Sequence, residues 1–177
     1  MMKRAIVLSL LSFLVVLISC ANLTAQNGRS AGGGERFADW CRDQANLSSE
    51  VQQTVEVLLA EADTQDCDQA EAVLTNWDRL QLFGSVTDLS PLASLTNLTE
   101  LTLENTAVAD LLPLANLTNL TRLQLRNNQI TDLSPLADLT QLTWLSLKDN
   151  NITDLSPLAS LTNLTWFEFG NSEITDL

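Results

Sequence analysis

Leucine recurs along the second half of the chain in a fixed pattern, with polar positions between the apolar ones. It occupies 26 of the 98 positions from residue 80 to residue 177, and the pattern repeats every 22 residues. The period is marked by four prolines, Pro91, Pro113, Pro135 and Pro157. Alternating leucines such as Leu123 and Leu125 predict a short strand with its apolar side chains on one face. A repeat of this length predicts a solenoid in which each strand pairs in parallel with the strand of the next unit.

Other positions of the repeat predict how each unit turns. Asn128 and Asn150 follow the strands, and we expect their amides to bond backbone groups left free there. Ser134-Pro135, like its counterpart one repeat later, predicts a short helix or 3₁₀ turn on the opposite side. Serine would be its N-cap and proline its first residue. Because one unit cannot bury its own leucines, stability should come from stacking neighbouring units.

An aspartate precedes each of these turns at the same period. The series is Asp88, Asp110, Asp132, Asp154 and Asp176. Carboxylates are ligands for calcium, but each of these directly precedes a predicted turn, so we expect local capping. The repeats extend over residues 76–177, as about four units and a truncated last one. The first unit is one residue shorter, between Leu82 and Val86, than the later ones.

Residues 35–75 have a helical pattern instead. One apolar stripe has the spacing of a helix face and comprises Val51, Val55, Leu58, Leu59 and Ala62. Ser48 or Ser49 is placed to cap it, and Asp66 to cap a following helix with Ala70, Val73 and Leu74 on its apolar face. A shorter face before them contains Phe37, Trp40 and Cys41. The segment therefore predicts a small helical cap on the N-terminal end of the repeats.

The N-terminus has the features of an export signal. Lys3 and Arg4 precede an apolar run over residues 5–18, which is shorter than the about 20 residues of a membrane-spanning helix. The run ends in Leu-Ile-Ser-Cys20, which resembles the lipobox of bacterial lipoproteins and implies lipidation of Cys20 after removal of residues 1–19. The alternatives are ordinary signal cleavage after Ala21 and retention of the run as an uncleaved anchor. Residues 20–34 are small and polar, as in a flexible tether.

Three cysteines are present, and either form of processing removes Cys20 from the count. The remaining pair, Cys41 and Cys67, predicts a structural disulfide in an oxidising compartment, with two buried thiols as the alternative.

The spacing of the repeat resembles the leucine-rich repeat, and the sequence Ile-Thr-Asp-Leu-Ser-Pro-Leu-Ala-x-Leu is similar to the 22-residue form found in internalins of bacterial surfaces. The resemblance covers about residues 76–177. It implies an α/β solenoid with a parallel sheet on its concave face, a helical N-terminal cap, and a role in binding other proteins.

In the geometry that this resemblance implies, the variable strand positions point to the concave surface. The first row is Arg79, Glu100, Arg122, Trp144 and Trp166; the second is Gln81, Thr102, Gln124, Ser146 and Glu168; the third is Phe83, Glu104, Arg126, Lys148 and Gly170. Exposed Trp and Arg often dominate binding energy at interfaces. We therefore expect a patch of five residues, Trp144, Trp166, Arg122, Arg126 and Lys148, to bind a protein or peptide, and its charge would suit an acidic segment. We call this group the aromatic-basic patch. The alternative is that the two indole rings only shield an open end of the solenoid.

Composition narrows the class of function. The chain has 9 basic and 22 acidic residues and a net charge of −13, which is the wrong sign for nucleic acid. It has no His, no Tyr and no phosphate-binding loop, so neither catalysis nor a cofactor or metal is expected. Membrane contact would come only from the N-terminal lipid. The sequence thus predicts a lipid-anchored extracytoplasmic binding module. The alternatives are a secreted or periplasmic protein, a recognition arm of a longer protein, or a glycan-binding protein.

Overall fold

The computed structural model describes residues 36–170, which belong to one compact unit. Residues 1–35 and 171–177 are not described. The predicted signal peptide, the predicted tether with Cys20, and the last apolar positions of the predicted last repeat therefore lie outside the described residues.

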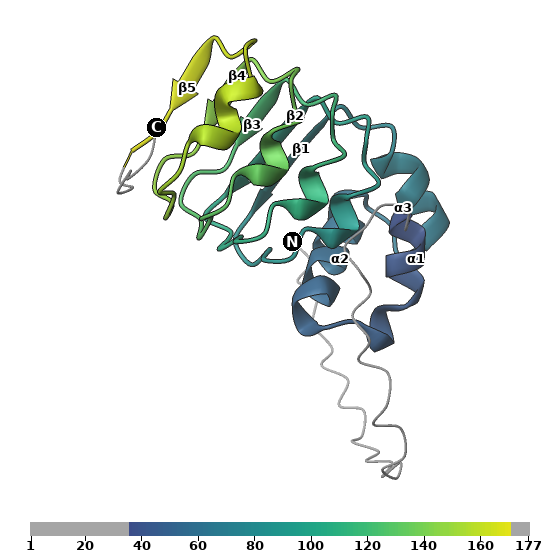
Figure 1. Cartoon of the computed structure of the whole chain (residues 1–177). Helices are drawn as coiled ribbons and strands as arrows, with labels where there is room; N and C mark the ends of the chain where they lie inside the picture. The colour runs from purple at the N-terminus through teal and green to yellow at the C-terminus, as the bar shows by residue number, and fades with distance from the viewer. Residues whose placement is uncertain (1–35, 171–177) are drawn as a thin grey trace, which may run out of the picture. The chain divides into compact units, whose positions relative to one another are not determined.

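Five strands in residues 36–170 form one parallel sheet in sequence order (Figure 1). They are β1 (Arg79–Phe83), β2 (Glu100–Glu104), β3 (Arg122–Gln124), β4 (Trp144–Ser146) and β5 (Trp166–Glu168). Each is followed, on the other side of the coil, by a short 3₁₀ helix or by the end of the described chain. These helices are η2 (Ser90–Leu92), η3 (Leu112–Leu114), η4 (Ser134–Leu136) and η5 (Ser156–Ser160). The predicted parallel solenoid is confirmed.

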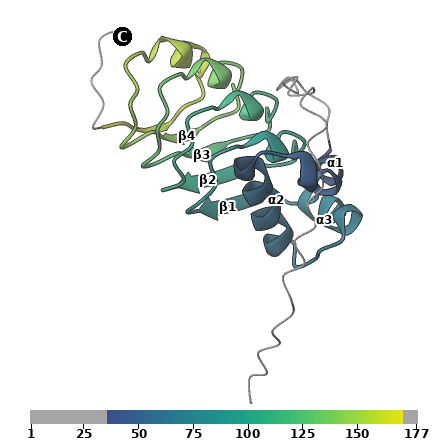
Figure 2. The ribbon, with the colours of Figure 1, turned by 90° about the horizontal axis from the view of Figure 1, so that it is seen from below.

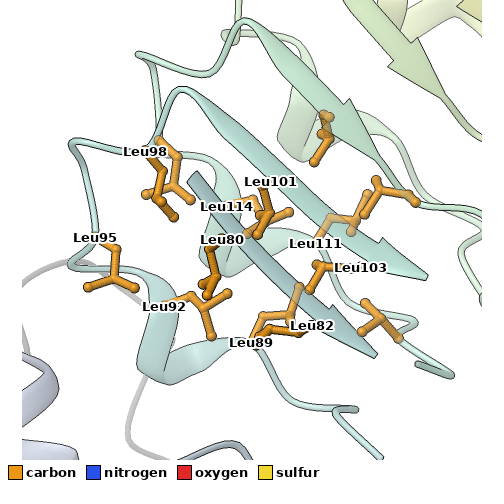
Figure 3. Close-up of a cluster of buried hydrophobic side chains, with 14 of the residues drawn as sticks. Leu80, Leu82, Leu89, Leu92, Leu95, Leu98, Leu101, Leu103, Leu111 and Leu114 are labelled. Atoms are coloured by element: carbon orange, nitrogen blue, oxygen red, sulfur yellow. The ribbon is translucent and has the colours of Figure 1, made fainter. Parts of the chain in front are cut away.

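The core lies between the strands and the 3₁₀ helices (Figure 3). Leu101 and Leu103 of β2 point inward and are almost fully buried, whereas Glu100, Thr102 and Glu104 alternate with them on the outer face. Figure 3 shows leucines of neighbouring units, among them Leu80, Leu92 and Leu114, filling the same interior. Each leucine is therefore covered in part by the next unit, as stacking of repeats requires.

Asparagine side chains join successive repeats after the strands. The Asn128 amide donates to the carbonyls of Leu103 and Arg126, at 2.9 and 3.2 Å, and its Oδ1 accepts from the Val108 N–H and the Thr106 hydroxyl. Asn150 has a similar role one repeat later. Its amide donates to the carbonyls of Leu125, Leu147 and Lys148, and its Oδ1 accepts from the Ile130 N–H. The predicted role of these amides is confirmed. Many of their hydrogen bonds join a residue of one repeat to a residue of the preceding repeat.

The shortened first unit closes with a glycine. Gly84 has φ +81°, a conformation that L side chains rarely adopt, directly after β1. The tight turn allows Val86 to reach the core although one residue is missing, and Leu80 still pairs in register with Leu101.

Aspartate, not serine, caps the 3₁₀ helices. The Oδ1 atom of Asp132 accepts a hydrogen bond of 2.8 Å from the Ser134 N–H, and the same contact recurs in each described unit. Ser134 is itself the first residue of its helix and Pro135 the second, so the serine N-cap prediction was wrong. The expectation that the aspartate series serves local capping is confirmed for the four members inside residues 36–170.

Three α-helices cover the β1 end of the core (Figure 2). They are α1 (Phe37–Arg42), α2 (Ser49–Glu61) and α3 (Cys67–Leu74), with the 3₁₀ helix η1 (Gln44–Asn46) after α1. Ser48 and Asp66 cap α2 and α3 through their side chains, as predicted. Val73 was expected on the apolar face of α3 but is 37% exposed; Ala70 and Leu74 make that contact.

A disulfide between Cys41 and Cys67 joins α1 to α3, with the two Cα atoms 5.6 Å apart. Beside it the Arg42 guanidinium donates to Asp68 and lowers the pKa of that carboxyl. A further bond of 2.7 Å runs from the Thr54 hydroxyl of α2 to the carbonyl of Asp88, and so ties the helices to the first repeat. The predicted pairing of the two cysteines is confirmed.

Candidate ligand-binding surface

The outward side chains of the five strands form one surface, which we call the sheet face. It is the surface that lines the concave side in solenoids of this construction. The five members of the first variable row are in register across the sheet, as the pattern predicted. The backbone bonds after β3 and β4, such as Asn127 N–H to the Lys148 carbonyl at 3.0 Å, continue this register to the third row.

Trp144 and Trp166 stack face to face on the sheet face. Their ring centroids are 4.2 Å apart and their planes differ by 2°. The guanidinium carbon of Arg122 lies 3.9 Å from the centroid of Trp144. Since β3 and β5 flank β4, Arg122 and Trp166 cover opposite faces of the Trp144 ring. The three side chains therefore form a continuous stack across three strands.

This stack determines what a partner can touch. Both faces of Trp144 and one face of Trp166 are occupied by neighbouring side chains, so a ligand meets mainly ring edges and the exposed side of the Arg122 guanidinium. Trp144 is half-buried and Trp166 is 40% exposed. Stacked aromatic rings and a cation over an indole each contribute about 0.5–1 kcal/mol. The surface is accordingly held in shape before a ligand arrives.

Arg79, at the other end of the first row, is paired within the protein. Its guanidinium lies 3.5 Å from Glu100 and 4.0 Å from Asp78. Glu100 therefore forms its ion pair with Arg79. It forms none with Arg122, its other neighbour in the row. The two ends of the row consequently differ, one being charge-compensated and the other aromatic and cationic.

Polar contacts join members of the second row to each other and to the third row. Gln124 donates to Glu104 at 3.1 Å, and the Ser146 hydroxyl donates to Glu168 at 2.8 Å. Ser146 is fully buried, so its hydroxyl is inaccessible to a substrate. Arg126 reaches Glu168 as well, with 4.0 Å between Nε and Oε2.

Arg126 therefore differs from the other cations of the aromatic-basic patch. It was expected as a cation offered to a ligand, but it points toward Glu168, which is two strands away and also holds Ser146. The Nε atom of Arg126 is buried and makes no hydrogen bond. The repeat pattern places Glu168 in the second row but does not show this network. The only signal for it in the sequence is a carboxylate one repeat after Ser146.

Two further side chains of the sheet face, Phe83 and Lys148, belong to the third row. Phe83 is 57% exposed at the β1 end, and Lys148 is half-buried at the β4 end. Lys148 forms no ion pair within residues 36–170. The structure thus brings Trp144, Trp166 and Arg122 into direct contact, and leaves Lys148 on the same face in the third row.

These features define a class of protein. The 22-residue period, the parallel sheet in sequence order, the 3₁₀ helix opposite each strand and the buried asparagine after it together make a leucine-rich-repeat solenoid.

Comparison with solved structures supports the leucine-rich-repeat fold and indicates which type of repeat protein this chain resembles. Internalin C2 of Listeria monocytogenes is 46% identical, with a TM-score of 0.50, over 55% of this chain and 45% of that one. An internalin of the same species, InlF, is 27% identical with a TM-score of 0.58, over 75% of this chain and 48% of that one. A leucine-rich-repeat protein of Leptospira interrogans is 28% identical with a TM-score of 0.55, over 60% and 28%. This chain is therefore similar, in its repeat and in its fold, to internalin-type leucine-rich-repeat proteins of bacteria.

The match is partial in length. This chain spans less than half of each of the three solved chains. No protein-family model matches it, and no curated protein matches it closely enough to be compared. Within the part of the chain that the structure describes, no helix has the length and apolar character needed to cross a membrane.

Proposed function

We propose that this chain is a non-enzymatic, lipid-anchored extracytoplasmic protein that binds a protein or peptide on its sheet face. The observation that carries the proposal is the stack of Arg122, Trp144 and Trp166 on that face. Leucine-rich-repeat solenoids present an extended concave surface suited to such partners. Large rigid side chains that are fixed before binding lose little conformational entropy in a complex.

The geometry of the stack limits what a sugar could use. A sugar ring packs on the face of an aromatic side chain; both faces of Trp144 are occupied by Trp166 and Arg122, so such a ligand would depend on the outer face of Trp166 alone. The indole edges and N–H groups together with a guanidinium suit the mixture of apolar and polar groups along a peptide.

Export is supported by the sequence and by the disulfide, and lipid anchoring by the sequence. The basic residues Lys3 and Arg4, the apolar run that follows them, and Cys20 have the order of a lipoprotein signal. A disulfide between Cys41 and Cys67 is typical of an oxidising compartment.

Selection from a displayed library of random peptides tests the binding site. The immobilised protein should enrich peptides that the variant with both Trp144→Ala and Trp166→Ala no longer holds. Phe83→Ala is the matched control, because it removes another exposed aromatic side chain at the far end of the same face. Circular dichroism verifies that each variant is folded. If the double variant retains the selected peptides, the ligand-binding surface lies elsewhere and the proposal fails.

The anchor is tested by the intact mass of the protein purified from its native membranes. The expected mass begins at an acylated Cys20, and Cys20→Ala should release the protein from the membrane fraction. A mass that begins at Asn22 without lipid would instead identify a secreted or periplasmic protein.

A further inference from the structure

The cations of this acidic protein are unequally compensated. Residues 36–170 contain six basic side chains, and four of them form ion pairs with carboxylates of the same region: Arg36, Arg42, Arg79 and Arg126. Arg122 and Lys148 form none there. Both lie on the sheet face, on the neighbouring strands β3 and β4 or directly after them.

Arg122 is held in a defined position without a carboxylate. Its guanidinium packs over the ring of Trp144 at 3.9 Å, and its row neighbour Glu100 is engaged by Arg79 at 3.5 Å. A guanidinium stacked by its plane keeps its N–H donors directed outward along its edge, where they match the two oxygens of a carboxylate.

Lys148 lies at a fixed separation from Arg122. The two positions are four residues apart along the strand direction and one strand apart across the sheet. With a rise of about 3.3 Å per residue and about 4.8 Å between strands, their backbones are roughly 14 Å apart. An extended peptide covers the same distance in about four residues.

The positions between these two cations carry no free charge. Gln124 lies two residues after Arg122 and is bonded to Glu104, and Ser146 lies two residues before Lys148 and is bonded to Glu168. The surface therefore offers two separate cationic positions with the indole edges beside the first. The carboxylates of Glu104 and Glu168 on the same face accept hydrogen bonds from Gln124 and Ser146, so these anions are engaged within the protein.

We infer that the partner segment is extended and carries two carboxylates about four residues apart, one received by Arg122 and the other by Lys148. The inference rests on the proposed function and names the chemical class of its ligand. Arg126 stays paired with Glu168 and positions that carboxylate over Ser146.

A defined peptide library tests this. Decapeptides carry Glu or Gln in all four combinations at two positions four residues apart, and neutral residues elsewhere at random. The wild-type protein should retain the Glu/Glu members about tenfold more than the Gln/Gln members, since two partly shielded ion pairs form. Arg122→Gln and Lys148→Gln should each reduce that preference about threefold.

Two further variants make the test specific. Arg42→Gln removes a cation of the helical cap that is already paired with Asp68 and lies outside the sheet face, and it should leave the preference unchanged. Arg122→Lys keeps the positive charge but loses the planar guanidinium that stacks on Trp144. Its preference for Glu/Glu peptides should lie between those of the wild type and Arg122→Gln.

The outcomes separate this inference from the proposed function. Equal retention of Glu and Gln peptides by the wild type, or a preference unaffected by Arg122→Gln and Lys148→Gln, overturns the inference. If Trp144→Ala with Trp166→Ala still abolishes retention in that case, the sheet face remains the binding site and only the ligand class is wrong. Retention of no library member by the wild type overturns the inference, while the random-peptide selection decides the binding site separately.

Discussion

The side-chain amide of Asn128 donates to the backbone carbonyl of Leu103, 2.9 Å away in the preceding repeat. The same side chain accepts from the Val108 N–H and the Thr106 hydroxyl of that repeat. Because these groups are buried, they have no access to water as a substitute partner. One polar side chain thus joins two units that otherwise meet through leucines.

Asn128→Ala should therefore be strongly destabilising. It leaves a buried carbonyl, N–H and hydroxyl without this partner, and such groups cost about 1–3 kcal/mol each when unsatisfied. We expect the free energy of unfolding, measured with urea, to fall by about 2–4 kcal/mol. Gln129→Ala is the control at an exposed neighbour and should change stability by less than about 0.5 kcal/mol. Equal effects of the two variants would contradict the role of Asn128.

Asp132→Ala should remove the cap of one 3₁₀ helix. Hydrogen bonds from the hydroxyl and the N–H of Ser134 lower the pKa of Asp132, so the ionised carboxylate is favoured in the folded state. The cap then stabilises the fold fully above the unfolded-state pKa of about 3.9, and this contribution disappears as the pH falls through the lower, folded-state value. At pH 7 the loss should be about 1 kcal/mol.

The pH dependence distinguishes capping from a packing effect. Urea titrations of Asp132→Ala and wild type should converge in acid below the folded-state pKa of Asp132. Asp138→Ala, at an exposed aspartate of the same repeat with no capping contact, should match wild type throughout. A constant difference between Asp132→Ala and wild type at every pH would show that the carboxylate charge is irrelevant.

Removing the disulfide should loosen the helical cap. The bridge closes a separation of 26 residues, for which the chain-entropy estimate is about 3 kcal/mol. Cys41→Ala with Cys67→Ala should lower the midpoint of urea unfolding, and dithiothreitol should do so for the wild type only. Insensitivity of the wild type to the reductant would mean that the bridge does not stabilise the fold.

The stacked tryptophans should give a spectroscopic signal. Two parallel indoles in contact couple excitonically, so Trp144→Phe or Trp166→Phe alone should abolish the far-ultraviolet couplet in circular dichroism. Trp77→Phe also removes one indole, but this ring packs against the core away from the stack, and the couplet should persist. A couplet that survives either variant of the stacked pair would exclude the stacked geometry in solution.

Deleting residues 162–177 should expose the end of the core. Leu145 and Leu147 are fully buried, and β5 lies beside β4 with Phe167 opposite Leu145. Without β5 these leucines lie at a free sheet edge, which favours association. Static light scattering should show aggregation of the shortened protein, whereas unchanged solubility would contradict the packing of β5 on β4.

The repeat pattern predicted most of the fold because each unit carries the same information. A period of 22 sets the strand register, and the alternation of leucines sets which side chains are buried. The incorrect serine cap was also avoidable from the sequence. The unit with Asp110 has Leu112 where others have serine, while aspartate occupies its position in every unit, so only aspartate is able to cap them all.

The exposure of single side chains was less predictable. Helical spacing placed Val73 on the apolar face of α3. This helix has only eight residues, and its packing buries Ala70 and Leu74 but not Val73. For Arg126 the pattern shows the row of the residue but not the reach of its side chain. That reach, diagonally to Glu168, depends on three strands lying side by side.

The sequence by itself determined the solenoid, the residues of its core and the rows of the sheet face, because these follow from local spacing repeated along the chain. It also determined the disulfide pair, because only two cysteines remain once Cys20 is set aside. Only the tertiary structure decided how the rows interact. Trp144 stacks between Arg122 and Trp166, Arg79 compensates Glu100, and Arg126 turns to Glu168. Side chains 22 residues apart come into contact only because parallel pairing places them on neighbouring strands. Their rotamers then decide which charged groups are paired within the protein and which are left to bind a partner.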